Sequence, residues 1–313
     1  YLLQINPQEF LTSTKGLDEL TFQGKSLHPA ILYAASQALL DAAAIINRST
    51  KAEVIAETFD LQIDPLWQVC IGIQSGPDRY SAVDKAIYRR VGAFPHGLIK
   101  NVEKDLGQRG EKLIDYARWI INRLKEHDVE PEYRPAIHFD CYGTIGEAFN
   151  RDIEKMTDYI KRLAAVVSPL TLQVESPVEM DSRQDQIDIL AHLRDALSKQ
   201  VENVELIADE WCNTLEDITL FCQAGAVDMI QVKMPDLGNI VHSIEGIVLC
   251  KQHGIGAYLG GSCNETDLSA RIAVNVAMAT QADQILARPG MGVDEAICIT
   301  ANEFARLRTL LKR

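Results

Sequence analysis

AIHFDCYG, at residues 136–143, begins a series of four short runs that decides the fold. The others are LTLQVES (170–176), VELIADEW (204–211) and MIQVKMP (229–235). Each run is rich in apolar or β-branched residues, which is typical of a buried parallel strand. Long stretches with apolar residues at i, i+3 or i+4 separate them, as in amphipathic helices. The alternation predicts repeated strand–helix units.

The same pattern extends in both directions along the chain. Further strand-like runs are WQVCIGIQ (67–74), VGAFPHGLI (91–99), IGAYLGG (255–261) and QILARP (284–289). Eight such units predict an α/β fold, a (β/α)8 TIM-type barrel over residues 66–313. An open doubly wound sheet is the main alternative, but its GxGxxG fingerprint is absent after the first strand.

Residues 1–65 form a separate region ahead of the barrel. They contain one strong helical pattern, PAILYAASQALLDAAAIINR at residues 29–48. The chain begins at Tyr1 rather than methionine, so we expect that some N-terminal sequence precedes it.

Composition limits the classes of partner. The chain has 313 residues, 47% hydrophobic and 24% charged, which is enough for one large core. Its formal net charge of -13 and scattered basic residues argue against nucleic-acid binding.

Cysteines and apolar runs indicate the compartment. Seven cysteines occur without a CxxC pair, which favours a reduced, cytoplasmic chain. No uninterrupted run of about 18 apolar residues and no signal sequence is present, so we expect no membrane insertion.

Three carboxylates lie near the ends of successive predicted strands. They are Asp140, Glu175 and Asp209, followed on the next strand by Lys233, at separations of 35, 34 and 24 residues. A parallel barrel would bring such groups to one rim. Carboxylate oxygens suit Mg²⁺ or Mn²⁺, although any single one of them could equally cap the following helix.

Polar side chains at other strand ends add to this candidate site. Gln231 precedes Lys233 by two residues, so both point to the same side of a strand. Lys233 near a metal could act as a base, or it could instead pair with Asp236. Gln74 and His96 lie at the ends of the first and second strands.

LGGSCNETD (259–267) is the most unusual local segment. Its glycines permit close backbone approach, and Glu265, Thr266 and Asp267 lie where the next helix should begin. Ser262 and Cys263 could therefore bind a carboxylate. Cys263 as a nucleophile is the less favoured interpretation, since no histidine is near it in sequence.

Taken together, these segments resemble the methylaspartate ammonia-lyase family, a branch of the enolase superfamily. The resemblance runs from Gln74 to the C-terminus through IQSGPDRY, FPHGLI, HFDCYGTIG, VESP, IADEWCNT, QVKMPDLGNI and GGSCNETD, in the family's order. It implies that residues 1–65 are the later part of a capping domain whose front is missing.

The resemblance also implies roles for individual residues. Asp140, Glu175 and Asp209 would hold Mg²⁺, with Mn²⁺ as an alternative ion and a monovalent cation such as K⁺ as activator. Lys233 would remove the (S)-configured C3 proton, and His96 would act on the other C3 epimer. The implied substrate contacts are Gln74, His96, Gln231, Ser262 and Cys263.

The implied reaction is removal of ammonia from L-threo-3-methylaspartate to give mesaconate, in glutamate fermentation, by a cytoplasmic homodimer. Ser262 stands where well-known members have threonine, which leaves open the preference among 3-substituted aspartates. Two alternatives stay open: another enolase-superfamily reaction (racemase, dehydratase or cycloisomerase), or an inactive barrel that acts as a binding module. The first is disfavoured by FPHGL, where those branches usually carry a K-x-K pair.

Overall fold

Eight parallel strands close into a barrel in the computed structural model, which describes residues 6, 9–76, 78–287 and 290–312. The strand order around the barrel is β10-β3-β4-β5-β6-β7-β8-β9. The strands are β3 (Cys70–Ile73), β4 (Ala93–Leu98), β5 (Ala136–Asp140), β6 (Leu172–Glu175), β7 (Val204–Ala208), β8 (Met229–Lys233), β9 (Gly256–Gly260) and β10 (Gln284–Ala287). The predicted barrel is confirmed, and the open sheet is wrong because β10 neighbours β3.

Each predicted strand contains one observed strand, but the observed strands are shorter. At the carboxyl ends the chain leaves the sheet through left-handed backbone, as at Tyr142 and Ser176, which both have a φ of 45°. Such φ values are uncommon for residues other than glycine and interrupt a strand. Residues 288–289 of the predicted last strand lie outside the described part of the chain.

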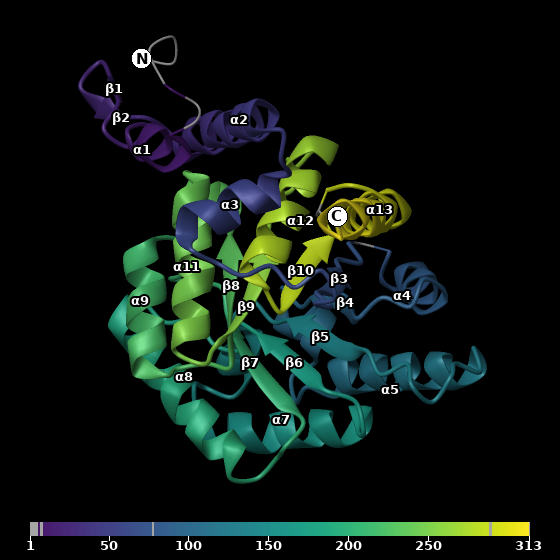
Figure 1. Cartoon of the computed structure of the whole chain (residues 1–313). Coiled ribbons are helices and arrows are strands. Elements are labelled where there is room, and N and C mark those ends of the chain that lie inside the picture. The colour runs from purple at the N-terminus through teal and green to yellow at the C-terminus, as the bar shows by residue number, and fades with distance from the viewer. Residues whose placement is uncertain (1–5, 7–8, 77, 288–289, 313) are drawn as a thin grey trace. The chain divides into compact units, whose positions relative to one another are not determined.

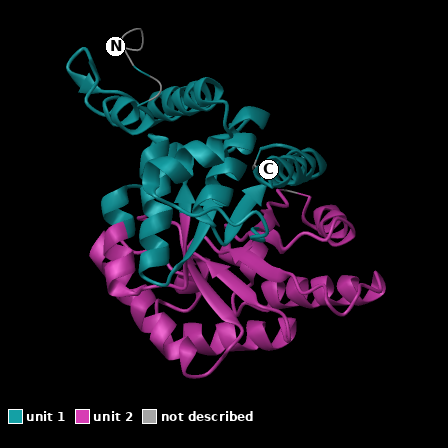
Figure 2. Cartoon of the chain, viewed as in Figure 1, with its two compact units in different colours: residues 1–69, 213–218, 232–313 teal, residues 70–212, 219–231 magenta. Residues whose placement is uncertain are grey.

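The chain divides into two compact units, coloured separately in Figure 2. Unit 1 contains residues 1–69, 213–218 and 232–313, and unit 2 contains residues 70–212 and 219–231. Helix α9 (Leu215–Ala224) contributes residues to both.

In unit 2, helices pack against the strand that comes next in the chain, as α7 (Ile153–Val167) does with β6 and α8 (Arg183–Ser198) with β7. Figure 1 shows α5 (Glu111–Glu126), α7 and α8 in chain order. Asp152 and Ser182 cap α7 and α8 through hydrogen bonds from the backbone amides of Lys155 and Asp185. The remaining helical segments of this unit are α4 (Arg79–Tyr88), the π-helix η2 (Val102–Leu106) and α6 (Thr144–Ala148).

Unit 1 has more structure in its N-terminal part than the sequence analysis predicted. The predicted helix is α2 (Pro29–Asn47), and a second helix, α3 (Lys51–Phe59), begins at a capping box formed by Thr50 and Glu53. This part also contains α1 (Phe10–Lys15) and the two-stranded sheet of β1 (Thr21–Phe22) and β2 (Lys25–Ser26). The other helices are α10 (Met234–Leu237), α11 (Ile240–Gln252), α12 (Asp267–Thr280) and α13 (Val293–Leu311).

An ionic network around a buried carboxylate joins α12 to α13. The carboxylate of Glu303 is only 1% exposed and accepts two hydrogen bonds from Arg306, at 2.6 and 2.9 Å. Asn275 and Arg271 each donate a further one at 3.2 Å. Burial alone would raise the pKa of Glu303, but these partners, Arg306 first, hold it below its ordinary value.

We expect Glu303→Gln to lower the free energy of unfolding at neutral pH by about 1–3 kcal/mol, because two arginines lose a buried partner. Because the pKa of Glu303 is lower in the folded than in the unfolded protein, its ionised carboxylate stabilises the fold at pH values above the unfolded-state pKa. This contribution disappears as pH falls through the folded-state pKa. The difference from wild type in urea unfolding should therefore shrink below about pH 4. Glu57→Gln, at an exposed position of α3, is the control and should change little.

One described helix, α2, has the length and average hydropathy of a membrane span. It has 19 residues and a mean hydropathy of 1.5, although Gln37 and Asp41 interrupt its apolar sequence. One third of its most apolar window is buried within the protein. Core helices and signal sequences have the same composition, so α2 is weak evidence for a membrane span.

Candidate active site

Two of the predicted carboxylates end neighbouring parallel strands of unit 2 and lie side by side in the sheet. Asp140 is the last residue of β5 and Glu175 the last of β6, and the two are paired. Asp209 follows β7 by one residue. All three side chains are buried. The fold therefore places the three groups at the carboxyl ends of three consecutive strands.

His96 lies beside two of these carboxylates. Its Nε2 atom is 3.6 Å from an oxygen of Asp140 and 3.5 Å from an oxygen of Glu175. The residue has a φ of 48°, and the register between β4 and β5 shifts between Pro95 and Gly97. A β-bulge with this backbone re-aims a side chain, and such irregularity is frequent next to active sites.

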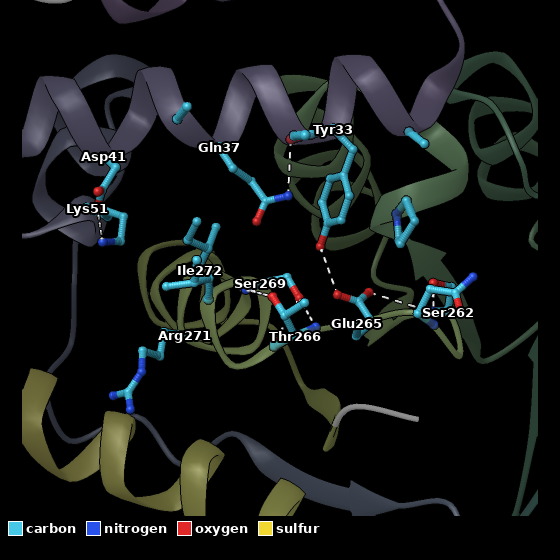
Figure 3. A pocket seen from close by; sticks show the side chains of 16 residues that line it. Tyr33, Gln37, Asp41, Lys51, Ser262, Glu265, Thr266, Ser269, Arg271 and Ile272 are labelled. Carbon is cyan, nitrogen blue, oxygen red and sulfur yellow. Dashed lines mark hydrogen bonds and ion pairs between the residues drawn. The ribbon is translucent and has the colours of Figure 1, made fainter. Parts of the chain in front are cut away.

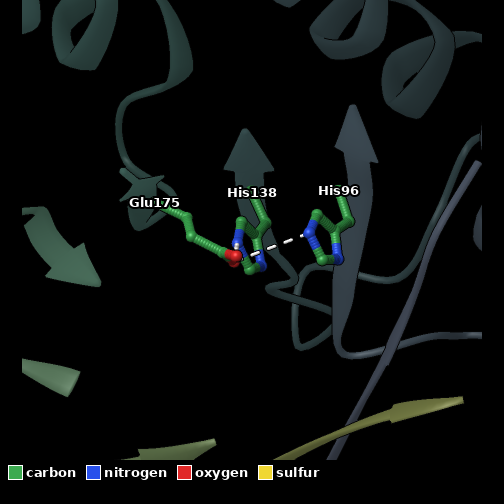
Figure 4. Close-up of side chains that lie close together, drawn as sticks. All are labelled: His96, His138 and Glu175. Carbon is green, nitrogen blue, oxygen red and sulfur yellow. Dashed lines mark hydrogen bonds and ion pairs between the residues drawn. The ribbon is translucent and has the colours of Figure 1, made fainter. Parts of the chain in front are cut away.

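His138 is a buried member of the cluster that the sequence analysis missed. Its Nε2 atom is 2.8 Å from Oε2 of Glu175, and its ring stacks on His96 with centroids 4.5 Å apart and planes at 7° (Figure 4). Burial lowers the pKa of His138 to about 4, although Asp140 opposes the shift. An ionised carboxylate can only accept, so a neutral ring makes this hydrogen bond with its proton on Nε2. Alternation along β5 was a usable signal, since His138 precedes Asp140 by two residues.

Gln231, a predicted site residue on β8, also contacts Glu175. Its Nε2 group donates a hydrogen bond to Oε1 of the carboxylate. The two oxygens of Glu175 thus have separate hydrogen-bond donors, Gln231 for one and His138 for the other. Gln74, half-buried, follows β3 by one residue.

Negative charge accumulates around this cluster. Burial raises the pKa of Tyr142, and the charges of Asp140, Asp209, Glu175 and Glu210 raise it further. A divalent cation would offset the mutual repulsion of the buried carboxylates. Three hard oxygen donors fit Mg²⁺, which also keeps positions for water or substrate.

The imidazoles of His96 and His138 do not suit a shared metal ion. One ligand atom from each, with one from Glu175, lies within 4.8 Å of the others. However, imidazole binds a metal in the plane of its ring, and an ion cannot lie in the planes of two parallel stacked rings at once. Asp140, Glu175 and Asp209 would be the better ligand set for a hard cation.

Unit 1 contains the other predicted site residues. Lys233 ends β8 and is half-buried, at the N-cap of α10. Ser262 and Cys263 follow β9, and the Cys263 thiol is exposed and free. The predicted helix start is confirmed, because the Thr266 hydroxyl caps α12 by accepting a hydrogen bond from the backbone amide of Ser269.

The segment after β9 is held at two points within unit 1. The carboxylate of Glu265 lies 3.4 Å both from the backbone amide of Ser262 and from the hydroxyl of Tyr33 on α2, beside a cavity of about 590 Å³ (Figure 3). Gly290, in the turn before α13, lies close to the same segment: a Cβ there would be 2.0 Å from the backbone oxygen of Cys263. These contacts determine where the Ser262 and Cys263 amides lie.

Comparison with known proteins identifies the family. Residues 1–60 match the model of the methylaspartate ammonia-lyase N-terminus, and residues 66–313 match that of its C-terminus. The chain belongs to the methylaspartate ammonia-lyase family. The predicted resemblance to this family is confirmed, and so is the prediction that the chain is an enzyme.

Individual members of the family align with most of the chain. Methylaspartate ammonia-lyase 2 of Carboxydothermus hydrogenoformans is 49% identical, covering 94% of this chain and 71% of that protein. Methylaspartate ammonia-lyase of Clostridium tetanomorphum is 43% identical, covering 97% of this chain and 73% of that protein.

Solved structures of the family have the same fold. The Mg complex of beta-methylaspartase from Clostridium tetanomorphum has a TM-score of 0.94 at 43% identity, covering 99% of this chain and 75% of that one. The Citrobacter amalonaticus enzyme containing (2S,3S)-3-methylaspartic acid has a TM-score of 0.96 at 41% identity, with the same coverages. A dipeptide epimerase from Enterococcus faecalis, 20% identical with a TM-score of 0.65, shares the fold alone.

Proposed function

We propose that this chain removes ammonia from L-threo-3-methylaspartate to give mesaconate, in a Mg²⁺-dependent reaction. The observation that carries the proposal is the family match along both regions, combined with three buried carboxylates at the ends of β5, β6 and β7. The related structures were solved with Mg and with (2S,3S)-3-methylaspartic acid.

The difficult step is loss of the C3 proton. A proton beside a carboxylate is weakly acidic, so the charge that develops on that carboxylate must be stabilised. Mg²⁺ held by Asp140, Glu175 and Asp209 would supply that electrostatic stabilisation. Lys233 takes the proton, the C3–H electrons form the C2=C3 bond, and ammonia leaves C2 with the C–N electrons.

The remaining residues bind and orient the diacid. His96 and Gln231 donate hydrogen bonds to the carboxylate that gains charge, and His96 also serves as the base for the other C3 epimer. The backbone amides and side chains of Ser262 and Cys263 hold the second carboxylate, with Gln74 as a further contact. Such positioning contributes to catalysis by fixing the reacting geometry.

Several broader features belong to the same proposal. They are a capping region at residues 1–65 followed by the barrel at 66–313, a homodimer, cytoplasmic location and activation by K⁺ or a similar cation. Neither nucleic acid nor membrane is proposed as a partner.

An absorbance assay tests the proposed reaction directly. Mesaconate is an unsaturated diacid, so absorbance at about 240 nm should rise when the protein meets 3-methylaspartate and Mg²⁺. EDTA should stop the rise, and added Mg²⁺ should restore it. No rise with this chain, under conditions where the Clostridium tetanomorphum enzyme is active, would contradict the proposal.

Gly290→Ala tests the binding role of Ser262 and Cys263. Gly290 has a φ of 82°, and the new Cβ would meet the Cys263 backbone, so the segment must move. We expect KM for 3-methylaspartate to rise by about tenfold or more, equivalent to about 1.4 kcal/mol of lost binding. Gly254→Ala is the control: its φ is 67°, but its Cβ would meet nothing within 4 Å. Equal effects of the two variants would show that backbone strain alone is responsible.

A further inference from the structure

We propose that His138 is a positioning residue that orients the Glu175 carboxylate for Mg²⁺ and supports the ring of His96. The inference rests on the proposed function, because it takes Glu175 as a metal ligand. Its starting point is geometry: His138 is 1% exposed, its Nε2 atom lies 2.8 Å from Oε2 of Glu175, and its ring lies flat against His96.

The first role follows from the two oxygens of Glu175. A glutamate carboxylate rotates freely about its last bond unless both oxygens have partners. Gln231 donates to Oε1 and His138 donates to Oε2, so the plane of the carboxylate is set from two strands, β8 and β5. Partners that hydrogen-bond a metal-binding carboxylate orient it before the ion arrives.

The second role follows from the stacked rings. His96 has left-handed backbone at a β-bulge, so its own strand does not hold the ring in a regular sheet position. The parallel ring of His138, 4.5 Å away, supplies a flat surface that keeps Nε2 of His96 between Asp140 and Glu175. One buried side chain therefore supports both a proposed metal ligand and a proposed base.

The chemistry of the side chain distinguishes positioning from metal binding. Two parallel stacked rings cannot both direct a ring nitrogen in plane at one ion, whereas a neutral imidazole can donate a hydrogen bond from Nε2 to a carboxylate. A glutamine in place of His138 would put its Nε2 amide at a similar distance from Glu175 and keep a hydrogen-bond donor there. Leucine and methionine fill comparable space without one.

The test is Mg²⁺ binding to the whole chain without substrate, measured by calorimetry and by the rise in Tm on adding Mg²⁺. We expect His138→Leu and His138→Met to raise Kd by about 10–100-fold, the usual effect of losing such a partner. His138→Gln should stay within about threefold of wild type, a change of less than 1 kcal/mol. If the leucine variant does not fold, the methionine variant gives the same comparison.

A second measurement shows whether losing His138 affects His96 specifically or disturbs the whole site. In His138→Leu, the rate of C3-proton exchange should fall more for the epimer whose assigned base is His96 than for the epimer whose assigned base is Lys233. Thr157→Val on α7 is the matched buried control, because Oγ1 of Thr157 has no hydrogen-bond partner among the described residues. It should bind Mg²⁺ as wild type does.

The outcomes distinguish this inference from the proposed function. Wild-type Mg²⁺ affinity in folded His138→Leu and His138→Met, with loss of affinity in Glu175→Gln, would overturn the role of His138 alone. An equally large loss in His138→Gln would overturn the donor argument. Unchanged affinity in Glu175→Gln, or no Mg²⁺ binding by wild type, would overturn the proposed metal site and the inference with it.

Discussion

Lys233→Ala is expected to lower kcat for (2S,3S)-3-methylaspartate by about 10²–10⁴-fold, the usual contribution of a positioned base. Without the amine, no group on the side assigned to Lys233 takes the C3 proton. KM should change less, because the proposal gives substrate binding to other residues. The absorbance assay for mesaconate measures both constants.

Two controls make the Lys233 result specific. Lys199→Ala removes an exposed lysine that pairs with Asp195 at the end of α8 and should leave kcat unchanged. Exchange of the C3 proton in the other epimer should persist in Lys233→Ala, because His96 is assigned to it. Full activity of Lys233→Ala on the (2S,3S) substrate would show that another residue is the base.

Asp140→Asn is expected to reduce activity by at least about a hundredfold, since a metal Lewis acid contributes several kcal/mol to such a step. Asparagine keeps the shape of the side chain and an oxygen donor but removes its charge. The rise in Tm that Mg²⁺ causes in wild type should become much smaller. Calorimetric titration with Mg²⁺ measures the weakened binding.

Asp236→Asn provides the comparison for Asp140→Asn. Asp236 is an exposed residue of α10 near the end of the same barrel strand as Lys233. Its neutralisation changes the net charge equally, so activity and Mg²⁺ binding should stay near wild type. A parallel loss in both variants would indicate a general electrostatic effect instead of a metal ligand.

Much of the barrel was predictable because its signal is local. Buried parallel strands such as LTLQVES require continuous apolar residues, and amphipathic helices require a 3.6-residue period, so the eight units are visible one at a time. Strand ends were less predictable. Ser176 and Tyr142 leave the sheet through left-handed backbone, which depends on the loops they enter.

The N-terminal part was predicted least well. Its third helix, α3, is only 9 residues long and packs against α12, where the backbone amide of Ala52 donates to the buried side chain of Asn275. A helix this short is marginal without tertiary contacts. Its own sequence pattern was therefore a weak signal.

The sequence by itself determined the barrel, its strand order along the chain and the candidate residues Asp140, Glu175, Asp209 and Lys233. These follow from periodicity and from residue type at strand ends, which are properties of neighbouring positions. Only the tertiary structure decided how the side chains around Glu175 interact. His138 and Gln231 are 37 and 56 residues from Glu175 in the chain, yet both donate to it. Hydrogen-bond direction and ring stacking depend on how strands pair and where a bulge turns His96, and no local pattern encodes them.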